Sequence, residues 1–427
     1  MVSPPSLFDV EAHSSVVNEI LQRLAPTGSF AAHKRAVTHS LSSERLPVTI
    51  LVTGTTGTLG SAFLANLVDD ISVAKIYAFN RPGRAGTSCV DRQKDGLVEA
   101  GFALTYAESP KVVFVEGDIT KEGIEVKGEK GVFDEMRNSV THIVHNAWPV
   151  NLAVKVTKFE RMLGSLRTLI DFALAAARNP RFIFVSSVAA LQNYPTEPIP
   201  ERLLPIEAAL GTGYGESKWI GEEMLRRAHA ETGLEIVIAR VAQLCGNRQT
   251  GVWRTNDSVP AVAQIALAVG VMPVIEGRCE WLPIDVGARC LRELVFHSDP
   301  PVVVHLVHPS PTIFQRIWVM LAKEVGIQKI EPLALWIKRI GSISTSESIP
   351  NSSMSASTSF LINLITSMWA GRDGPASYFT AVIECKLALE ACPSLHYVPP
   401  LNERDVAKWV KYWKEAGILS EVSKAKL

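Results

Sequence analysis

The sequence predicts an α/β fold, in which a doubly wound parallel sheet is accompanied by a smaller, mostly helical C-terminal subdomain. Short runs rich in valine and isoleucine alternate with helical stretches from residue 48 to about residue 245. Such alternation is typical of a parallel sheet with helices on both faces. A glycine-rich turn follows the first of these runs, where doubly wound folds bind nucleotides. Beyond residue 245 the pattern becomes mainly helical.

The expected elements follow one another in a regular order along the chain. The strands are VTILVTG (48–54), KIYAFN (75–80), KVVFVEGD (111–118), HIVHNA (142–147), RFIFVSS (181–187) and EIVIARVA (235–242). The helices between them include 58–70, 91–102, 159–177 and 213–233. Later segments add a strand candidate at 302–309 and helices at 312–326 and 404–417.

We expect the chain to be organised in three parts. Residues 1–46 form a lead-in, with one short helix at NEILQRLA followed by a polar linker. Residues 47–250 form the nucleotide-binding domain, and residues 251–427 form mainly the subdomain for substrate and partner docking. Within this last part, residues 342–359 contain nine serines and little that a core would bury. That composition predicts a flexible loop.

Composition excludes several classes of protein. The 427 residues carry 43 basic and 43 acidic side chains, so charge gives no reason to expect a nucleic acid or an acidic membrane as partner. The six cysteines show no C-x-x-C spacing, which predicts reduced thiols, a cytoplasmic setting and no metal site. The N-terminus lacks a signal-peptide pattern. The apolar runs 259–275 and 360–371 are too short or too interrupted to span a bilayer.

The turn after the first strand is expected to bind a dinucleotide. Gly54, Gly57 and Gly60 have a G-x-x-G-x-x-G spacing between a strand and a helix, which is the context of a Rossmann-type site. Glycines let the backbone approach a pyrophosphate, and the N-terminus of the next helix favours its charge. We expect the intervening residues to contact the cofactor too: Thr55, Thr56, Thr58 and Leu59. The alternative is a plain glycine-rich turn.

The end of the second strand predicts NADPH as the cofactor. A protein that binds NADH usually offers a carboxylate here, whereas this chain has Asn80 and Arg81. A guanidinium suits the 2′-phosphate of NADPH; the alternative for Arg81 is a solvated surface arginine. Asp118 and Ile119 follow the third strand and are expected near the adenine. Asp118 is equally able to cap the next turn.

A serine, a tyrosine and a lysine form the expected catalytic group. Ser187 ends a strand beside the expected cofactor site; its neighbour Ser186 is the alternate choice, and a turn-forming serine is the structural alternative. Tyr214 and Lys218 are four residues apart on one helix and so share a face. A phenol is a poor acid–base group at its ordinary pKa of about 10, and we expect the nearby ammonium to lower that pKa. The structural alternative is an exposed tyrosine near a solvated lysine.

These motifs resemble the extended short-chain dehydrogenase/reductase superfamily. More narrowly, they resemble the terminal thioester-reductase domains of fungal enzymes related to non-ribosomal peptide synthetases, which include adenylate-forming (carboxylic acid) reductases and aminoadipate reductases. The resemblance covers about residues 48–310. It rests on LVTGTTGTLGS, FNRPGR, EGDIT, VTHIVHNAWPV, RFIFVSSVA, GYGESKW, RVAQLCG and WLPIDVGA. One departure is Asn151, where related chains often carry an acid.

The resemblance implies a function for the expected site. Ser187, Tyr214 and Lys218 correspond to a catalytic triad, Lys218 also reaches the nicotinamide ribose, and Asn146 lies beside the nicotinamide. The implied reaction is NADPH-dependent reduction of an acyl thioester, held on the phosphopantetheine arm of a carrier protein, to an aldehyde, which a second round would reduce to an alcohol. The expected substrate-contacting residues are Trp148, Gln243 and Trp253, although a tryptophan such as Trp253 is more often a core residue.

Two other functions fit the same motifs. One is a free-standing reductase of acyl-CoA or of a small aldehyde or ketone. The other is a non-catalytic NADP(H)-binding regulator, because a fold does not by itself imply a function. The presence of both Tyr214 and Lys218 favours an enzyme over a regulator.

Overall fold

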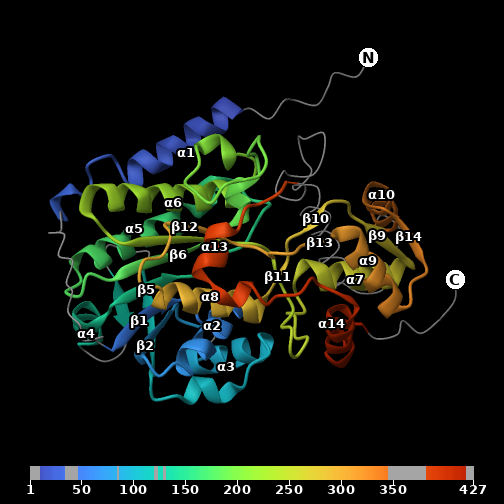
Figure 1. Ribbon diagram of the computed structural model, residues 1–427, viewed down its shortest axis with the longest axis horizontal. Coiled ribbons are helices and arrows are strands. Elements are labelled where there is room, and N and C mark those ends of the chain that lie inside the picture. The colour runs from blue at the N-terminus through green and yellow to red at the C-terminus, as the bar shows by residue number, and fades with distance from the viewer. Residues whose placement is uncertain are drawn as a thin grey trace.

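A central sheet of eight strands runs through the larger part of the molecule (Figure 1). The computed structural model describes residues 10–33, 47–83, 86–119, 124–127, 131–344 and 381–419. The strands of the sheet are β1 (Val48–Thr53), β2 (Val73–Asn80), β3 (Val112–Asp118), β4 (Glu125–Lys127), β5 (His142–His145), β6 (Arg181–Ser187), β7 (Ile236–Val241) and β12 (Val303–Leu306). Their order in space is β12-β7-β6-β5-β1-β2-β3-β4.

The order of the strands confirms the doubly wound parallel sheet. The chain moves outward from β1 through β2 and β3, then returns to the other side of β1 with β5, β6 and β7. Neighbouring strands are parallel except for β4, which pairs antiparallel with β3 at one edge. The reversal between β1 and β5 is the place where ligands bind in such sheets.

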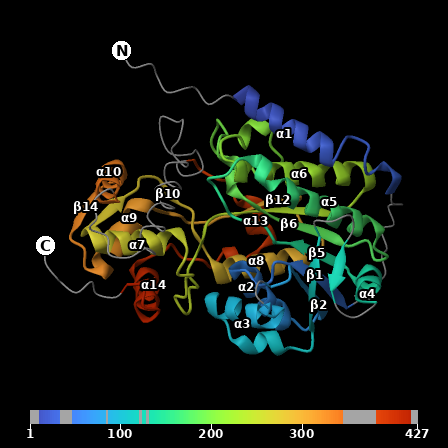
Figure 2. The ribbon, with the colours of Figure 1, turned by 180° about the vertical axis from the view of Figure 1, so that it is seen from behind.

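Helices cover both faces of the sheet (Figures 1 and 2). One face carries α1 (Val10–Leu24), α5 (Glu160–Ala175) and α6 (Gly213–Thr232), and α4 (Val132–Ser139) adds Met136 to the same core. The other face carries α2 (Thr58–Val68), α3 (Cys89–Glu99), α8 (Ile284–Phe296) and α13 (Lys386–Ala391). Short 3-10 helices connect these elements: η1 (Ala31–His33), η3 (Leu104–Glu108), η4 (Val156–Phe159), η5 (Val188–Leu191), η6 (Ile206–Ala208) and η7 (Pro393–Leu395).

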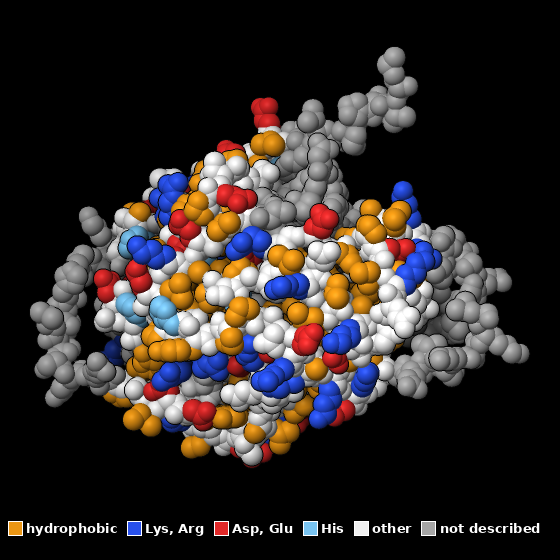
Figure 3. Space-filling view, turned by 45° about the vertical axis from the view of Figure 1, so that its right-hand side comes forward, with side chains coloured by type: hydrophobic (Ala, Val, Ile, Leu, Met, Phe, Trp, Pro, Cys, Tyr) orange, Lys and Arg blue, Asp and Glu red, His pale blue; other side chains and the backbone are white. Residues whose placement is uncertain are grey.

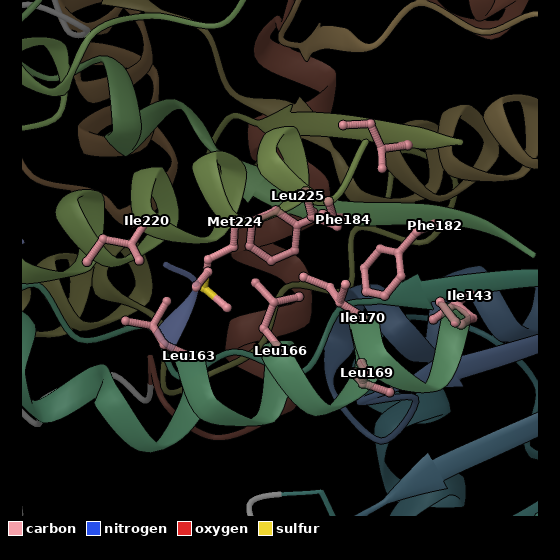
Figure 4. Packing of buried hydrophobic residues seen from close by; sticks show 14 of the residues in the cluster. Ile143, Leu163, Leu166, Leu169, Ile170, Phe182, Phe184, Ile220, Met224 and Leu225 are labelled. Carbon is pink, nitrogen blue, oxygen red and sulfur yellow. The ribbon is translucent and has the colours of Figure 1, made fainter. Parts of the chain in front are cut away.

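Alternate residues of each strand supply the two cores. On β6, Phe182 and Phe184 enter the core beneath α5 and α6, while Ile183 and Val185 enter the core beneath α2 and α8. Figure 4 shows the first of these cores, where Phe184 of β6 lies near Leu166 of α5 and Met224 of α6. These apolar side chains are buried on both faces, which explains why the strands read as continuous β-branched runs.

The helical subdomain lies beside one end of the sheet (Figures 1 and 2). Its helices are α7 (Ser258–Val269), α9 (Phe314–Val325), α10 (Leu333–Ser344) and α14 (Glu403–Glu415). Its short strands pair in twos: β9 (Val271–Val274) with β14 (Lys329–Pro332), β10 (Arg278–Cys279) with β13 (Thr312–Ile313), and β8 (Leu244–Cys245) with β11 (Leu282–Pro283). Six of the described tryptophans lie in its core: Trp253, Trp281, Trp318, Trp336, Trp409 and Trp413.

Two features differ from what we expected of the chain's organisation. The doubly wound pattern does not end near residue 245, because β12 pairs in parallel with β7 at the far edge of the sheet. The lead-in is also more than a linker: α1 is longer than the expected helix, and Val17, Ile20 and Leu21 enter the main core. The spacing of these three residues places them on one helical face.

The remaining expectations concern the surface and the loop. The serine-rich segment 342–359 lies outside the described residues apart from its first three, which end α10, so its flexibility stays a prediction. Within the described ranges, no helix combines the length and the apolar character that crossing a bilayer requires. Basic and acidic side chains are interspersed on the face seen in Figure 3, in keeping with their equal numbers.

Candidate active site

The glycine turn between β1 and α2 forms one side of the site. Gly54 has a φ of +73°, which side-chain-bearing residues rarely adopt, and a Cβ there would meet the Cα of Ala147 at 2.8 Å. A Cβ on Gly60 would lie 2.1 Å from the carbonyl oxygen of Gly54. By contrast, a Cβ on Gly57 would make only an ordinary contact, at 3.5 Å. Glycine at positions 54 and 60 therefore allows a tight turn whose backbone a pyrophosphate can approach closely.

Asn80, at the end of β2, holds this turn in place. Its Oδ1 accepts hydrogen bonds from the backbone N–H and the hydroxyl of Thr56, both at 3.3 Å. Its Nδ2 donates to the hydroxyl of Thr55 at 2.7 Å. Asn80 is buried, and so is Thr55, so these bonds support the loop from beneath. The side chain thus has a structural use that we did not expect from the sequence, and its contact with a cofactor stays a prediction.

Among the residues that the structure describes, two guanidinium groups lie near the end of β2. Arg81 is exposed, and its carbonyl oxygen accepts a hydrogen bond from Nη2 of Arg92 at 2.6 Å. Arg92 also pairs with Glu116 of β3 at 3.3 Å, and its Nε is buried without a hydrogen-bond partner among the described residues. We did not expect Arg92 from the sequence. Its position near the start of the helix after FNRPGR was the available signal.

The ends of β3 and β5 complete this side of the site. Asp118 ends β3 and pairs with Nη2 of Arg161 at 3.2 Å, and Ile119 after it is buried. Asn146 follows β5, and its Nδ2 donates to the carbonyl oxygen of Gly54 at 3.1 Å. The strand order thus brings Asn146 against the glycine turn, although more than 90 residues separate them. Contacts of Asp118 and Ile119 with an adenine stay predictions.

The alternation of side chains along β6 separates its last two serines. Ser186 is buried, and its hydroxyl donates to Oε1 of Glu222 at 2.5 Å. Ser187 points elsewhere: its hydroxyl lies close enough to that of Tyr214 to lower the pKa of the phenol, and it accepts a hydrogen bond from the N–H of Ala189 at 3.1 Å. Of the two serines, Ser187 is therefore the one that the structure brings to Tyr214.

Helix α6 carries both Tyr214 and Lys218. Thr212 caps the helix, its hydroxyl accepting from the N–H of Gly215 at 3.2 Å, so Tyr214 lies in the first turn. The Nζ of Lys218 donates to the carbonyl oxygen of Val185 at 2.8 Å and lies 4.4 Å from the ring centre of Trp148. It lies 5.8 Å from the ring centre of Tyr214. Tyrosine and lysine thus share a buried space at the end of β6.

The direction of the pKa shift of Tyr214 is opposite to the one we expected. Burial raises the pKa of Tyr214 to about 12, and the nearby Ser187 hydroxyl only partly opposes this. Burial also lowers the pKa of Lys218 well below its ordinary value, and the charge of Glu222 opposes that shift. The ammonium is directed at Val185 and Trp148. Tyr214 is consequently held as a neutral phenol, the form able to donate a proton.

The residues expected to contact substrate have different surroundings. Trp148 is half-buried, and its Nε1 donates to the hydroxyl of Ser217 at 3.2 Å. Gln243 is exposed, and its Nε2 donates to Ser258 at 3.4 Å. Trp253 is only 4% exposed and packs against Trp409 with ring centres 4.9 Å apart. The burial of Trp253 favours the core alternative, whereas Trp148 borders Lys218 directly.

The position after the NAWPV segment has a local structural use. Asn151 is exposed, and its Oδ1 accepts a hydrogen bond from the N–H of Ala153 at 3.0 Å. This bond closes a short turn of the kind that asparagine favours.

The sequence matches an established family at the residues that build this site. Residues 52–291, more than half of the chain, match the model of an NAD-binding family described as male sterility protein. The chain belongs to this family. Membership identifies it as an NAD(P)-dependent oxidoreductase with a Rossmann-type fold, as the sheet and the glycine turn indicated.

The curated relatives of this chain are longer fungal proteins, and the match covers about a third of each. The adenylate-forming reductase Nps10 of Heterobasidion annosum is 34% identical over 382 residues, which cover 86% of this chain and 35% of the relative. Nps11 of Serpula lacrymans is 30% identical over 86% of this chain and 35% of the relative. The chain therefore spans about a third of the length of these relatives. They confirm the resemblance to fungal adenylate-forming reductases.

Solved structures confirm the fold. The terminal R domain of the myxalamid PKS-NRPS pathway superposes with a TM-score of 0.78 and 22% identity, covering 96% of this chain and all of that one. A thiolation-reductase di-domain of an archaeal non-ribosomal peptide synthetase gives a TM-score of 0.67 with 19% identity, covering 95% of this chain and 81% of that one.

Proposed function

We propose that this protein releases an acyl group from a carrier protein by NADPH-dependent reduction of its phosphopantetheine thioester. The product is an aldehyde, which a second round of reduction would convert to an alcohol. The observation that carries the proposal is the convergence of the Ser187 hydroxyl, the Tyr214 phenol and the Lys218 ammonium at the carboxyl end of β6. The similarity to adenylate-forming reductases supports a thioester as the substrate class.

The side chains of the site suit proton delivery to a carbonyl oxygen. Ser187 and Tyr214 are placed to donate hydrogen bonds to the thioester carbonyl and so to stabilise the negative charge that develops on its oxygen. The raised pKa of Tyr214 keeps its proton available until that charge forms. Lys218, anchored at Val185, places a cationic group beside the phenol that favours the phenolate formed on proton transfer.

The reaction balances without an enzyme nucleophile. NADPH, when bound, supplies the hydride to the carbonyl carbon. Tyr214 gives its proton to the carbonyl oxygen, which yields a hemithioacetal. The carbon–sulfur bond then breaks: the hydroxyl proton returns to the Tyr214 phenolate, the pantetheine sulfur leaves as a thiolate that takes a proton from solvent, and the other product is an aldehyde. The six cysteines are all unpaired and have no part in these steps. Their reduced state supports a cytoplasmic location as part of the proposal.

The choice of NADPH rests on the charge near the end of β2. The close backbone approach at Gly60 fits the pyrophosphate of a dinucleotide. Arg81 is exposed there, and Arg92 lies against its backbone, so two guanidinium groups are near the position expected for a 2′-phosphate. Asn80 occupies the position where NADH-binding proteins usually present a carboxylate, and its amide is engaged with the loop.

A carrier protein is the proposed partner. One structure with this fold is described as a thiolation-reductase di-domain, and the relatives are about three times longer than the matched region. In this chain Trp148 borders Lys218, and Gln243 is exposed after β7, so both are available to line the path of an acyl group. The acyl chain and the pantetheine arm would then reach Tyr214 from the side of the helical subdomain.

The proposal is tested by offering one acyl group in three forms. Turnover of NADPH is measured with the acyl group on a phosphopantetheinylated carrier protein, on coenzyme A, and as the free aldehyde, and products are identified by mass spectrometry. We expect the carrier-bound thioester to give the highest kcat/KM and an aldehyde product. Preference for coenzyme A or for the free aldehyde would instead identify a free-standing reductase. No oxidation of NADPH with any of the three would contradict the proposal.

A further inference from the structure

A buried polar network lies one helical turn beyond Lys218 and takes no part in the steps above. Glu222 of α6 is 1% exposed. Its Oε1 accepts a hydrogen bond from the hydroxyl of Ser186 at 2.5 Å. Both of its carboxylate oxygens accept from the guanidinium of Arg240 on β7, at 2.6 to 3.2 Å. Arg240 is fully buried and also lies 3.2 Å from Nε2 of His305 on β12.

Stability alone is a weak explanation for this network. Removing two charges from water costs free energy, and apolar residues of similar volume often stabilise a core at least as well as a buried ion pair. A well-attested use of such pairs is to select one arrangement of the elements that carry them. The geometry around Glu222 indicates which arrangement is selected here.

The network connects the turn of α6 that carries Lys218 to the strand that Lys218 contacts. Lys218 donates to the carbonyl of Val185, and the next residue of β6, Ser186, donates to Glu222. Ser186 is also paired with Arg240 in the register of β6 and β7. One carboxylate therefore binds two neighbouring strands at the level of the Lys218 acceptor.

The apolar side of α6, which packs against α5, does not fix the position of the helix as narrowly. Figure 4 shows Ile220 and Met224 of α6 facing the α5 side chains, which include Leu163 and Leu166. Apolar packing of this kind is strong but non-directional. Hydrogen bonds to a carboxylate are directional, so the Glu222 network restricts the rotation and sliding that apolar packing permits.

We propose that Glu222, held by Ser186 and Arg240, is a positioning residue that keeps the ammonium of Lys218 at the Val185 carbonyl and beside Tyr214. This inference rests on the proposed function, because Lys218 matters to the reaction only if Tyr214 is the proton donor. It assigns Glu222 no contact with substrate or cofactor.

The charge of Glu222 gives this role a measurable signature. Several titratable or charged groups surround Lys218 and Glu222: Tyr214 on α6, His145 on β5, Arg240 on β7 and His305 on β12. Burial lowers the pKa of Lys218, and the charge of Glu222 raises it. Loss of the Glu222 charge therefore lowers the pKa of Lys218 further, so the ammonium is lost at lower pH. The alkaline limb of the pH profile of kcat should therefore move to lower pH.

The test compares Glu222→Gln with Glu223→Gln in the full chain with NADPH and an acyl-pantetheine. Glu223 is the adjacent residue of α6, and its carboxylate pairs with Arg226 and Arg227 instead of the network. We expect E222Q to lower kcat about tenfold, to leave KM within about twofold, and to shift the alkaline limb of kcat down by at least about half a pH unit. E223Q should show none of these changes. If E222Q folds and the alkaline limb of its kcat profile is not shifted, the inference is overturned.

A second variant covers the case in which E222Q does not fold because Arg240 is left unpaired. Ser186→Ala removes one hydrogen bond but keeps the buried ion pair. We expect it to lower kcat by roughly threefold or more at unchanged KM, whereas wild-type kcat in S186A would overturn the inference. Turnover by the wild type decides the proposed function separately. If the wild type reduces only a free aldehyde, the same comparison is made with that aldehyde, and if it reduces nothing, both proposals fall.

Discussion

The hydroxyl groups of Ser187 and Tyr214 lie close together in the space beside the Lys218 ammonium, although the serine ends strand β6 and the tyrosine lies in the first turn of helix α6. The carboxyl end of a parallel strand and the N-terminus of a helix meet here. Both side chains can therefore address one oxygen atom from different elements. The proposed reaction depends on this convergence.

The preference for NADPH should depend on Arg81. Arg81→Glu is expected to raise the Kd of NADPH by about 10- to 100-fold, since hydrogen bonds to charged groups contribute about 1.5–3 kcal/mol. The affinity for NADH should change far less. Isothermal titration with each cofactor measures both. Lys94→Ala is the control, because Lys94 of α3 pairs with Glu108 of η3. Retained NADPH preference in R81E would refute the role of Arg81.

The glycine turn offers a matched pair of substitutions. Gly60→Ala forces a methyl group to 2.1 Å from the carbonyl of Gly54, so the turn must open. We expect a loss of at least about 2 kcal/mol in unfolding free energy and no measurable NADPH binding. Gly57→Ala meets its nearest neighbour at an ordinary 3.5 Å and should change the unfolding free energy by less than about 1 kcal/mol. Equal melting temperatures for the two variants would show that the turn is not packed as described.

Acid should destabilise the protein through its buried histidines. Burial lowers the pKa of His145 to about 3, from 6.5 in an unfolded chain, so the folded state keeps the ring neutral. Its contribution to stability is present above pH 6.5 and is lost as the pH falls toward 3. His145→Asn removes this titration, and the Tm of the variant should fall less steeply with acid. Exposed His33→Asn serves as control and should follow the wild type. Identical acid slopes for H145N and wild type would contradict the prediction.

The sequence predicted local features better than long-range ones. Each strand from β1 to β7, apart from the short β4, was predictable because β-branched runs and glycine or helical segments alternate over short distances. The sequence favoured Ser187 but left Ser186 as an alternate, since the choice depends on the side chain that each serine meets, Tyr214 or Glu222. The predicted direction of the Tyr214 pKa shift was wrong for a related reason. The four-residue spacing from Tyr214 to Lys218 indicates a nearby lysine, but it does not show how deeply the phenol is buried.

Contacts between distant segments were beyond the reach of one sequence. Helix α1 looked like a lead-in, yet His13 bonds to Glu216 of α6 at 2.8 Å, and 203 residues separate them. Trp253 packs against Trp409 in a core that joins both ends of the subdomain. Such partners can be identified only in the folded structure, which also places the guanidinium of Arg92 at the carbonyl oxygen of Arg81.

The central claim is that Tyr214 delivers the proton to the thioester carbonyl, and Tyr214→Phe tests it most directly. The variant keeps the ring and removes the hydroxyl. Oxidation of NADPH is followed by absorbance with an acyl-pantetheine as substrate, and NADPH binding is measured in parallel. We expect kcat to fall by about 10²- to 10⁴-fold while the Kd of NADPH stays within about twofold. A Y214F protein that reduces the thioester at the wild-type rate would contradict the claim.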